Sequence, residues 1–178
     1  MAPIKSTVMS RRDLEFLLFE WLAVDALTKR PRFAEHSRET FADVLDLCED
    51  LATRYFAPHN KKSDQNEPSF DGTTVTVIPE VKQAIDAFAA ADLLGMTMDH
   101  ALGGSQLPVS VAQAGFAWFS AANLSTSGYL MLTVANANLV SKFGSPEQIE
   151  RFVKPMLAGR FTGTMALSEP QAGSSLAD

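Results

Sequence analysis

The stretch "RFTGTMALSEPQAGSS" (160–175) decides how this sequence is interpreted. Residues 160–167 alternate apolar side chains with Thr, which favours a β-strand. Residues 168–175 gather Ser, Gly and Pro, which are typical of a turn. Hydroxyls and backbone N–H groups in a tight turn form anion-binding concavities, so a phosphate-bearing ligand would suit it. Many such turns bind nothing, and the stretch is not a P-loop, a GxGxxG fingerprint or a GxSxG elbow, so these residues alone leave ligand binding open.

The sequence before this stretch has the periodicity of helices. Apolar side chains recur every three or four residues, which is the pattern of helices with one buried face. Ser145, Pro146 and Gln148 form the signature of a capped helix start, and Gly159 ends that helix. The predicted helices are 11–27 capped by Ser10, 37–58 capped by Ser37 and ended by Pro58, 79–95 ended by Gly95, two within 109–141 with a break near 123–128, and 145–159. Residues 58–74 and 99–108 are predicted loops, with a short strand at 74–78.

A single strand after five or six helices is not a stable unit, because its edges have no partners. The chain is therefore expected to be a fragment, or to find its sheet partners on another polypeptide.

Composition narrows the class of protein. The chain has 178 residues and a net charge of −6 without a basic stripe, which argues against nucleic-acid binding. The single Cys48 lies on a helical apolar stripe, which indicates a core residue and a reducing compartment, here taken as the cytoplasm. No apolar run reaches the ~20 residues that span a bilayer. His36, His59 and His100 are interpreted as surface residues without metal-site partners.

Residues 108–141 contain no Asp, Glu, Lys or Arg. Helices that are apolar all round lie inside a larger structure. This segment is expected to pack on all sides, in this domain or against other domains or subunits. A helical scaffold or oligomerisation module without a ligand therefore stays open as a function.

Several motifs together resemble the acyl-CoA dehydrogenase family. "MALSEPQAGSS" (165–175) resembles the family's flavin-binding motif, and "ALGGSQLP" (101–108) resembles its Gly-Gly loop. Residues 142–170 resemble the end of its N-terminal helical domain. The opening "LEFLLFEWL" (14–22) and "APHNKKSDQNEPSFDG" (57–72) resemble the long, 3-methylmercaptopropionyl-CoA dehydrogenase-like subgroup. The resemblance covers roughly residues 40–178.

This resemblance implies a mainly α fold, with the family's N-terminal helical bundle followed by the first strand of a truncated β domain. The implied divisions are an extension helix at 1–36, the helical domain at 37–160 and the start of the middle β domain at 161–178.

The resemblance also implies an FAD site, residue by residue. The backbone at Met165 and Leu167 would line the isoalloxazine ring, and the Ser168 hydroxyl would hydrogen-bond the flavin. Gly173 and Ser174 would lie near the FAD pyrophosphate, with Ser174 also at the acyl-CoA site.

Helix 126–141 would border the acyl cavity, with Met131, Leu132 and Ala135 as candidate lining residues. A plain core role is the alternative for each of the three. Two positions depart from the family pattern. Ser175 replaces the usual Asp and loses its charge, and Met165 stands where an aromatic residue is common.

The implied reaction is oxidation of an acyl-CoA thioester to the 2,3-enoyl-CoA, by α-proton abstraction and β-hydride transfer to flavin. The family's base lies in a later helical domain and does not correspond to Glu169, so the isolated chain is expected to be inactive and to bind FAD poorly. The implied partners are an electron-transfer flavoprotein or similar acceptor, and copies of the chain in a homodimer or homotetramer. An acyl-CoA oxidase and a non-redox flavin-binding relative are the alternatives within the fold.

Overall fold

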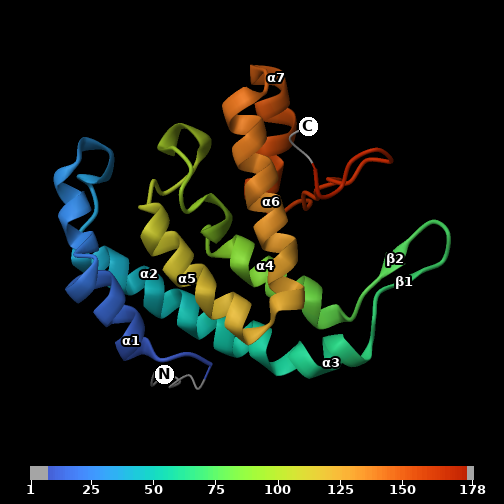
Figure 1. Ribbon diagram of the computed structural model, residues 1–178, viewed down its shortest axis with the longest axis horizontal. Coiled ribbons are helices and arrows are strands. Elements are labelled where there is room, and N and C mark those ends of the chain that lie inside the picture. Colours follow the sequence, from blue (N-terminus) through green and yellow to red (C-terminus); the bar gives the residue numbers. More distant parts are fainter. Residues whose placement is uncertain (1–7, 176–178) are drawn as a thin grey trace.

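The computed structural model describes residues 8–175, which form a bundle of helices with a short hairpin projecting from one end (Figure 1). The α-helices are α1 (Arg11–Glu15), α2 (Arg38–Leu51), α3 (Asn60–Gln65), α4 (Pro79–Ala90), α5 (Val109–Ala122), α6 (Leu124–Phe143), α7 (Pro146–Gln148) and α8 (Lys154–Leu157). Shorter 3₁₀ or π-helical turns occupy Phe16–Trp21, Val24–Lys29, Pro31–Phe33, Ala52–Phe56, Ala57–His59, Leu93–Gly95, His100–Leu102 and Ile149–Val153. The strands in this range are β1 (Ser69–Phe70) and β2 (Val75–Thr76), paired antiparallel. The mainly helical class is confirmed.

Local capping signals set several helix starts, as predicted. The Ser10 and Ser37 hydroxyls accept hydrogen bonds from the first turns of α1 and α2. Ser145 and Gln148 form the predicted capping box at α7. Asn123 caps α6 through its side chain, which produces the expected break between α5 and α6.

The core lies between α2, α4 and α5. Seven of the 14 residues of α5 are buried, in agreement with its apolar pattern. Phe119 packs edge-to-face on Phe56 and Phe88, with ring centroids 4.9 and 4.8 Å apart. Cys48 is fully buried and burial raises the pKa of its thiol to about 12, so it is a core residue as expected.

Three of the predicted boundaries differ in the structure. Helix α4 ends at Ala90 rather than Gly95, because Asp92 takes a left-handed conformation (φ 57°). The predicted loop 58–74 contains α3, so Pro58 does not end the helical path. The first helix is interrupted by a π turn and by Ala23 at φ 47°. The predicted strand at 74–78 exists as β2, and the Asp71 carboxylate holds its turn by accepting from the backbone N–H groups of Thr73 and Thr74.

Gly159 ends the last helix with φ 68°, as predicted. A side chain there would also collide with α4, because an added Cβ would lie 2.4 Å from Ala89 Cβ. Among the helices of residues 8–175, none combines the length and the apolar character needed to cross a membrane.

Candidate functional site

The turn at 168–175 is the feature for which the family resemblance implies a ligand. The backbone N–H of Glu169 donates to the carbonyl of Ala172 at 2.8 Å, and the N–H of Ala172 donates back at 3.2 Å. Pro170 and Gln171 therefore form a two-residue loop, and the expected turn is present. The paired residues bring their neighbours Ser168 and Gly173 to the same end of the turn.

The five predicted cofactor-binding residues all lie on the surface. Met165 and Leu167 precede the turn and are 54% and 55% exposed. Ser168, Gly173 and Ser174 are also exposed, and a Cβ added at Gly173 would meet no atom within 4 Å. The segment therefore offers hydroxyls, peptide groups and apolar side chains to whatever covers it.

The strand predicted at 160–167 is wrong for this structure. Residues 162–169 have no regular secondary structure, and no other strand in residues 8–175 lies beside them. The physical reason is that a strand needs a hydrogen-bonding neighbour, and here the segment's polar groups bond to a helix instead.

Two polar residues of α6 fix the start of this segment. The N–H of Gly163 donates to Thr133 Oγ1 at 3.0 Å, and Asn136 Nδ2 donates to the carbonyl of Thr164 at 2.8 Å. Gly163 lies so close to α6 that an added Cβ would be 2.8 Å from Asn136 Cβ. Sequence reasoning missed both anchors, although polar residues three apart within the uncharged segment 108–141 were a usable signal.

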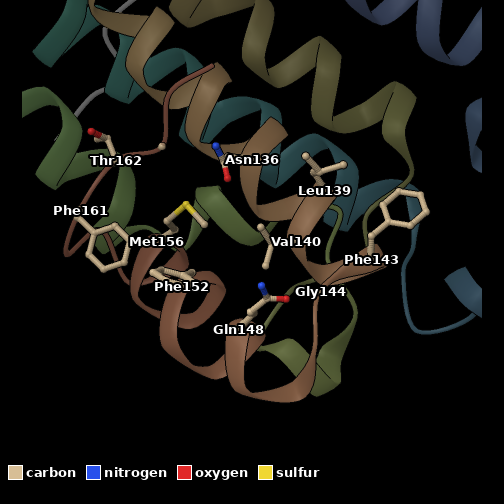
Figure 2. Close-up of a pocket in the computed structure, with 11 residues that line it drawn as sticks. Asn136, Leu139, Val140, Phe143, Gly144, Gln148, Phe152, Met156, Phe161 and Thr162 are labelled. Carbon is tan, nitrogen blue, oxygen red and sulfur yellow. The ribbon is translucent and has the colours of Figure 1, made fainter. Parts of the chain in front are cut away.

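A cleft lies on each side of the point where residues 163 and 164 bond to α6. One, of about 340 Å³, is lined by Ser125, Gly128, Tyr129 and Leu132 of α6 and by residues 162–164. The other, of about 440 Å³, lies between α6, the helix formed by residues 146–157 and residues 161–163 (Figure 2). Its wall is largely apolar, with Val140, Phe152 and Met156 facing the space and the amides of Asn136 and Gln148 at its sides.

A third hollow of about 330 Å³ lies where α4, α5 and α6 meet, and Met131 lines it. Leu132 lines the cleft beside residues 162–164 instead, because adjacent helical residues point about 100° apart. Ala135, one turn after Met131, is half-buried and lies between Met131 and Leu132 around the helix axis. The three candidate acyl-cavity residues therefore share one open stripe of α6 but do not line a single cavity.

His59 corrects the interpretation of the histidines as surface residues. Its ring is only 2% exposed, and Nε2 lies 2.8 Å from Thr126 Oγ1 in the first turn of α6. Burial lowers the pKa of His59, although the nearby Tyr55 backbone and the Glu80 carboxylate oppose this shift. The ring therefore links residues 57–59 to the start of α6. In the part of the chain that the structure describes, no three His, Cys, Asp or Glu side chains gather as a metal-binding group.

The family described as "Acyl-CoA dehydrogenase, N-terminal domain" matches residues 38–160. This chain belongs to the acyl-CoA dehydrogenase family. A butyryl-CoA dehydrogenase of Syntrophomonas wolfei is 29% identical to it, and a 3-methylmercaptopropionyl-CoA dehydrogenase of Ruegeria pomeroyi is 27% identical. Each alignment covers 93% of this chain and 28% of the relative. The chain thus spans little more than a quarter of the length of these relatives.

Two solved structures share the fold. The butyryl-CoA dehydrogenase of Megasphaera elsdenii aligns with a TM-score of 0.63 and 23% identity, over 76% of this chain and 34% of that one. A chain in the structure of the electron transferring flavoprotein of Acidaminococcus fermentans aligns with a TM-score of 0.64 and 21% identity, over 79% and 34%. Both alignments support the family's N-terminal helical domain as the architecture.

Proposed function

We propose that this chain is the N-terminal portion of an FAD-dependent acyl-CoA dehydrogenase, which oxidises an acyl-CoA thioester to the 2,3-enoyl-CoA. The observation that carries the proposal is the position of the motif: the exposed turn at 168–175 directly follows the family's helical domain, matched over residues 38–160. In this proposal residues 37–160 are that domain, 1–36 precede it and 161–178 begin the next.

The donor set of the turn fits FAD. Ser168 and Ser174 offer hydroxyls, and Gly173 leaves room for close approach of a pyrophosphate to the backbone. Met165 and Leu167 expose apolar side chains, and their peptide groups would line the ring. FAD, when bound, supplies the hydride acceptor. The role proposed for these residues is to hold and orient it.

The open stripe of α6 is proposed to border the acyl group. Gly128, Met131, Leu132 and Ala135 follow one another at helical spacing, and Met131 is 52% exposed. Leu132 is the candidate on the side where residues 162–164 lead toward the flavin motif. Ser174 would contact the acyl-CoA from the turn.

The proposed partners follow from family membership. They are the acyl-CoA substrate, an electron-transfer flavoprotein or similar acceptor, and further copies in a homodimer or homotetramer. The cytoplasm is the proposed location. The catalytic base is proposed to come from a later helical domain, so the 178-residue chain alone is expected to be inactive and to retain FAD poorly.

The deciding experiment is an intact mass and a visible absorption spectrum of the native protein, followed by addition of acyl-CoA without oxygen. We expect a mass above 19.3 kDa per chain and flavin absorption that acyl-CoA bleaches. A colourless protein of 19.3 kDa that cannot be loaded with FAD would refute the proposal and favour a scaffold. Rapid reoxidation of the bleached flavin by oxygen would instead indicate an oxidase.

A matched pair of variants tests the residue assignment. Ser168→Ala removes the proposed flavin hydrogen bond, so the dissociation constant for FAD should rise about three- to tenfold. Ser141→Ala is the control, because the Ser141 hydroxyl donates to the Asn138 carbonyl within the same helix, α6. Equal FAD affinity in both variants would remove Ser168 from the site.

A further inference from the structure

Helix α6, which carries the open stripe proposed for the acyl group, has a largely polar buried side. Only five of its 20 residues are buried, and three of these are Thr126, Ser127 and Thr133. Leu130 is the one large apolar side chain among the five. Apolar contacts have no preferred direction, so packing alone sets the rotation of this helix about its axis only loosely.

The rotation of α6 decides where the open stripe points. The buried side includes a line of four residues at helical spacing: Thr126, Leu130, Thr133 and Ala137. Adjacent helical residues point about 100° apart, so the open stripe lies on roughly the opposite side of the helix. Side-chain tips lie about 5–6 Å from a helix axis, so a turn of about 10° moves them by about 1 Å. A displacement of that size is enough to spoil the fit of a substrate.

A hydrogen bond from outside the helix opposes such a turn. His59 Nε2 lies 2.8 Å from Thr126 Oγ1, and the two residues are only 2% and 1% exposed. Hydrogen bonds to nitrogen weaken beyond about 3.2 Å, so a turn that lengthens this one by about 0.5 Å breaks it. The bond is therefore sensitive to small rotations that apolar packing would tolerate.

His59 belongs to a well-packed part of the bundle. It ends a short 3₁₀ turn directly after Phe56, whose fully buried ring packs against Phe119, and this turn leads into α3 beside the start of α6 (Figure 1). Asn123, the cap of α6, bonds to the same region, because its Nδ2 donates to the Phe56 carbonyl at 3.3 Å. Asn123 holds the first residue of the helix in place, and the bond to Thr126, three residues later, adds the second point that a fixed rotation requires.

The other anchors of α6 do not provide such a frame. Thr133 and Asn136 bond to residues 163 and 164, which belong to a segment without regular secondary structure. A segment of this kind can follow the helix as it turns, whereas the packed turn that ends at His59 cannot.

Stability alone does not account for an imidazole at this position. Within residues 8–175 its second nitrogen, Nδ1, is buried without a hydrogen-bond partner, and a buried unpaired polar atom costs free energy. Replacing both members of a buried polar pair by apolar groups of similar shape is often neutral or stabilising. His59→Leu together with Thr126→Val would make that replacement, and it would remove only the bond that has a direction.

We infer that His59 is a positioning residue for the acyl group, because its bond to Thr126 sets the rotation of α6 and so the direction of the open stripe. The inference rests on the proposed function, in which this stripe borders the acyl group. His59 touches neither the acyl group nor the flavin in this arrangement and acts only through Thr126.

The double variant His59→Leu/Thr126→Val tests the inference in the native protein loaded with FAD. Without the bond, fewer molecules hold α6 in the rotation that binds substrate, which raises KM for acyl-CoA and leaves kcat unchanged. We expect KM to rise about three- to tenfold while the midpoint of thermal unfolding does not fall. A merely structural role gives the opposite pattern, in which less folded protein lowers the apparent kcat at an unchanged KM.

Two single variants complete the design. His59→Gln keeps an amide within reach of Thr126 Oγ1 and should bring KM back to within about twofold of the parent. Ser63→Ala is the matched control, because the Ser63 hydroxyl donates to the His59 carbonyl at 2.9 Å and not to its ring. Its KM should equal that of the parent. The inference is overturned if the double variant keeps the parent KM, or if Ser63→Ala raises KM as much as the double variant does.

Amide hydrogen exchange of the same proteins separates this inference from the proposed function. In the double variant, exchange in residues 124–135 should speed up at least tenfold, while exchange in α2 and α5 stays unchanged. Unchanged exchange in α6 would overturn the inference even in an active dehydrogenase. A parent protein that turns over no acyl-CoA would refute the proposed function and the role in acyl positioning, and exchange alone would then decide whether His59 fixes α6.

Discussion

The contact between α2 and α5 is so close at Gly115 that it allows a sharp test of the packing. A Cβ added at Gly115 would lie 2.8 Å from Cys48 Sγ but 3.7 Å from Cys48 Cβ. Ordinary contacts between such atoms are about 3.5–4.0 Å. Gly115→Ala should therefore force the helices apart, or push the fully buried sulfur into another rotamer, and removing the sulfur should relieve the clash.

The magnitudes follow from these distances. Overpacking a core costs about 1–3 kcal/mol, and replacing Gly by Ala inside a helix returns about 1 kcal/mol. Gly115→Ala should thus lower the free energy of unfolding by up to about 2 kcal/mol. Cys48→Ala alone should lower it by about 1 kcal/mol, because it leaves a small void. The double variant fills that void with the new methyl group and should lie near the parent, a coupling of about 1–3 kcal/mol.

Urea denaturation of the four proteins measures this coupling. Gly128→Ala in α6 is the matched control, since an added Cβ there meets nothing within 4 Å and should raise the unfolding free energy by about 1 kcal/mol. If the two single changes simply add in the double variant, to within about 0.5 kcal/mol, the steric argument is refuted.

Three further outcomes are expected. Ser145→Ala removes the capping box of α7 and should lower the unfolding free energy by about 1 kcal/mol in the same assay, whereas Ser141→Ala should not. Burial lowers the pKa of His59 in the folded chain, so on acidification the unfolded chain binds a proton at this residue at a higher pH than the folded chain does. The free energy of unfolding should therefore fall as the pH drops below ~6.5, the ordinary pKa of His. Thermal unfolding across that pH range should show a shallower fall in His59→Gln. Asn136→Ala removes the bond to the Thr164 carbonyl and should speed limited proteolysis after Arg160 several-fold, while Asn138→Ala, at the neighbouring exposed amide, should leave the rate unchanged.

Short-range signals were the part of the fold that the sequence could predict. Capping by Ser10, Ser37 and Ser145 depends on residues three positions away, so a stretch of four residues is enough to predict it. The helical period of α2 and α5 follows equally from local spacing. The motif at 168–175 was also found as a turn, because Pro170 and Gly173 mark it locally.

Contacts between distant segments could not be predicted in the same way. The buried ring of His59 hydrogen-bonds to Thr126, 67 positions later in the chain, and no residue near His59 in the sequence predicts this contact. Residues 160–167 have the alternation of apolar and polar side chains that a strand needs. This alternation shows only that the two kinds of side chain would point to opposite faces of an extended chain. Whether a strand forms depends on a neighbour, and here Thr133 and Asn136 take that place.

Helix α6 explains why the uncharged segment carries isolated polar residues. On one side, Thr133 and Asn136 hold residues 163 and 164, from which the chain continues into the proposed flavin motif. On the next side lies the open stripe proposed for the acyl group, and the remaining side is core. Thr133 is buried, so a Lys or Glu in its place would need its own counter-charge, whereas the hydroxyl satisfies a peptide group without one. The same two side chains thus set the distance between the stripe and the motif, so changes at them should affect cofactor and acyl binding together.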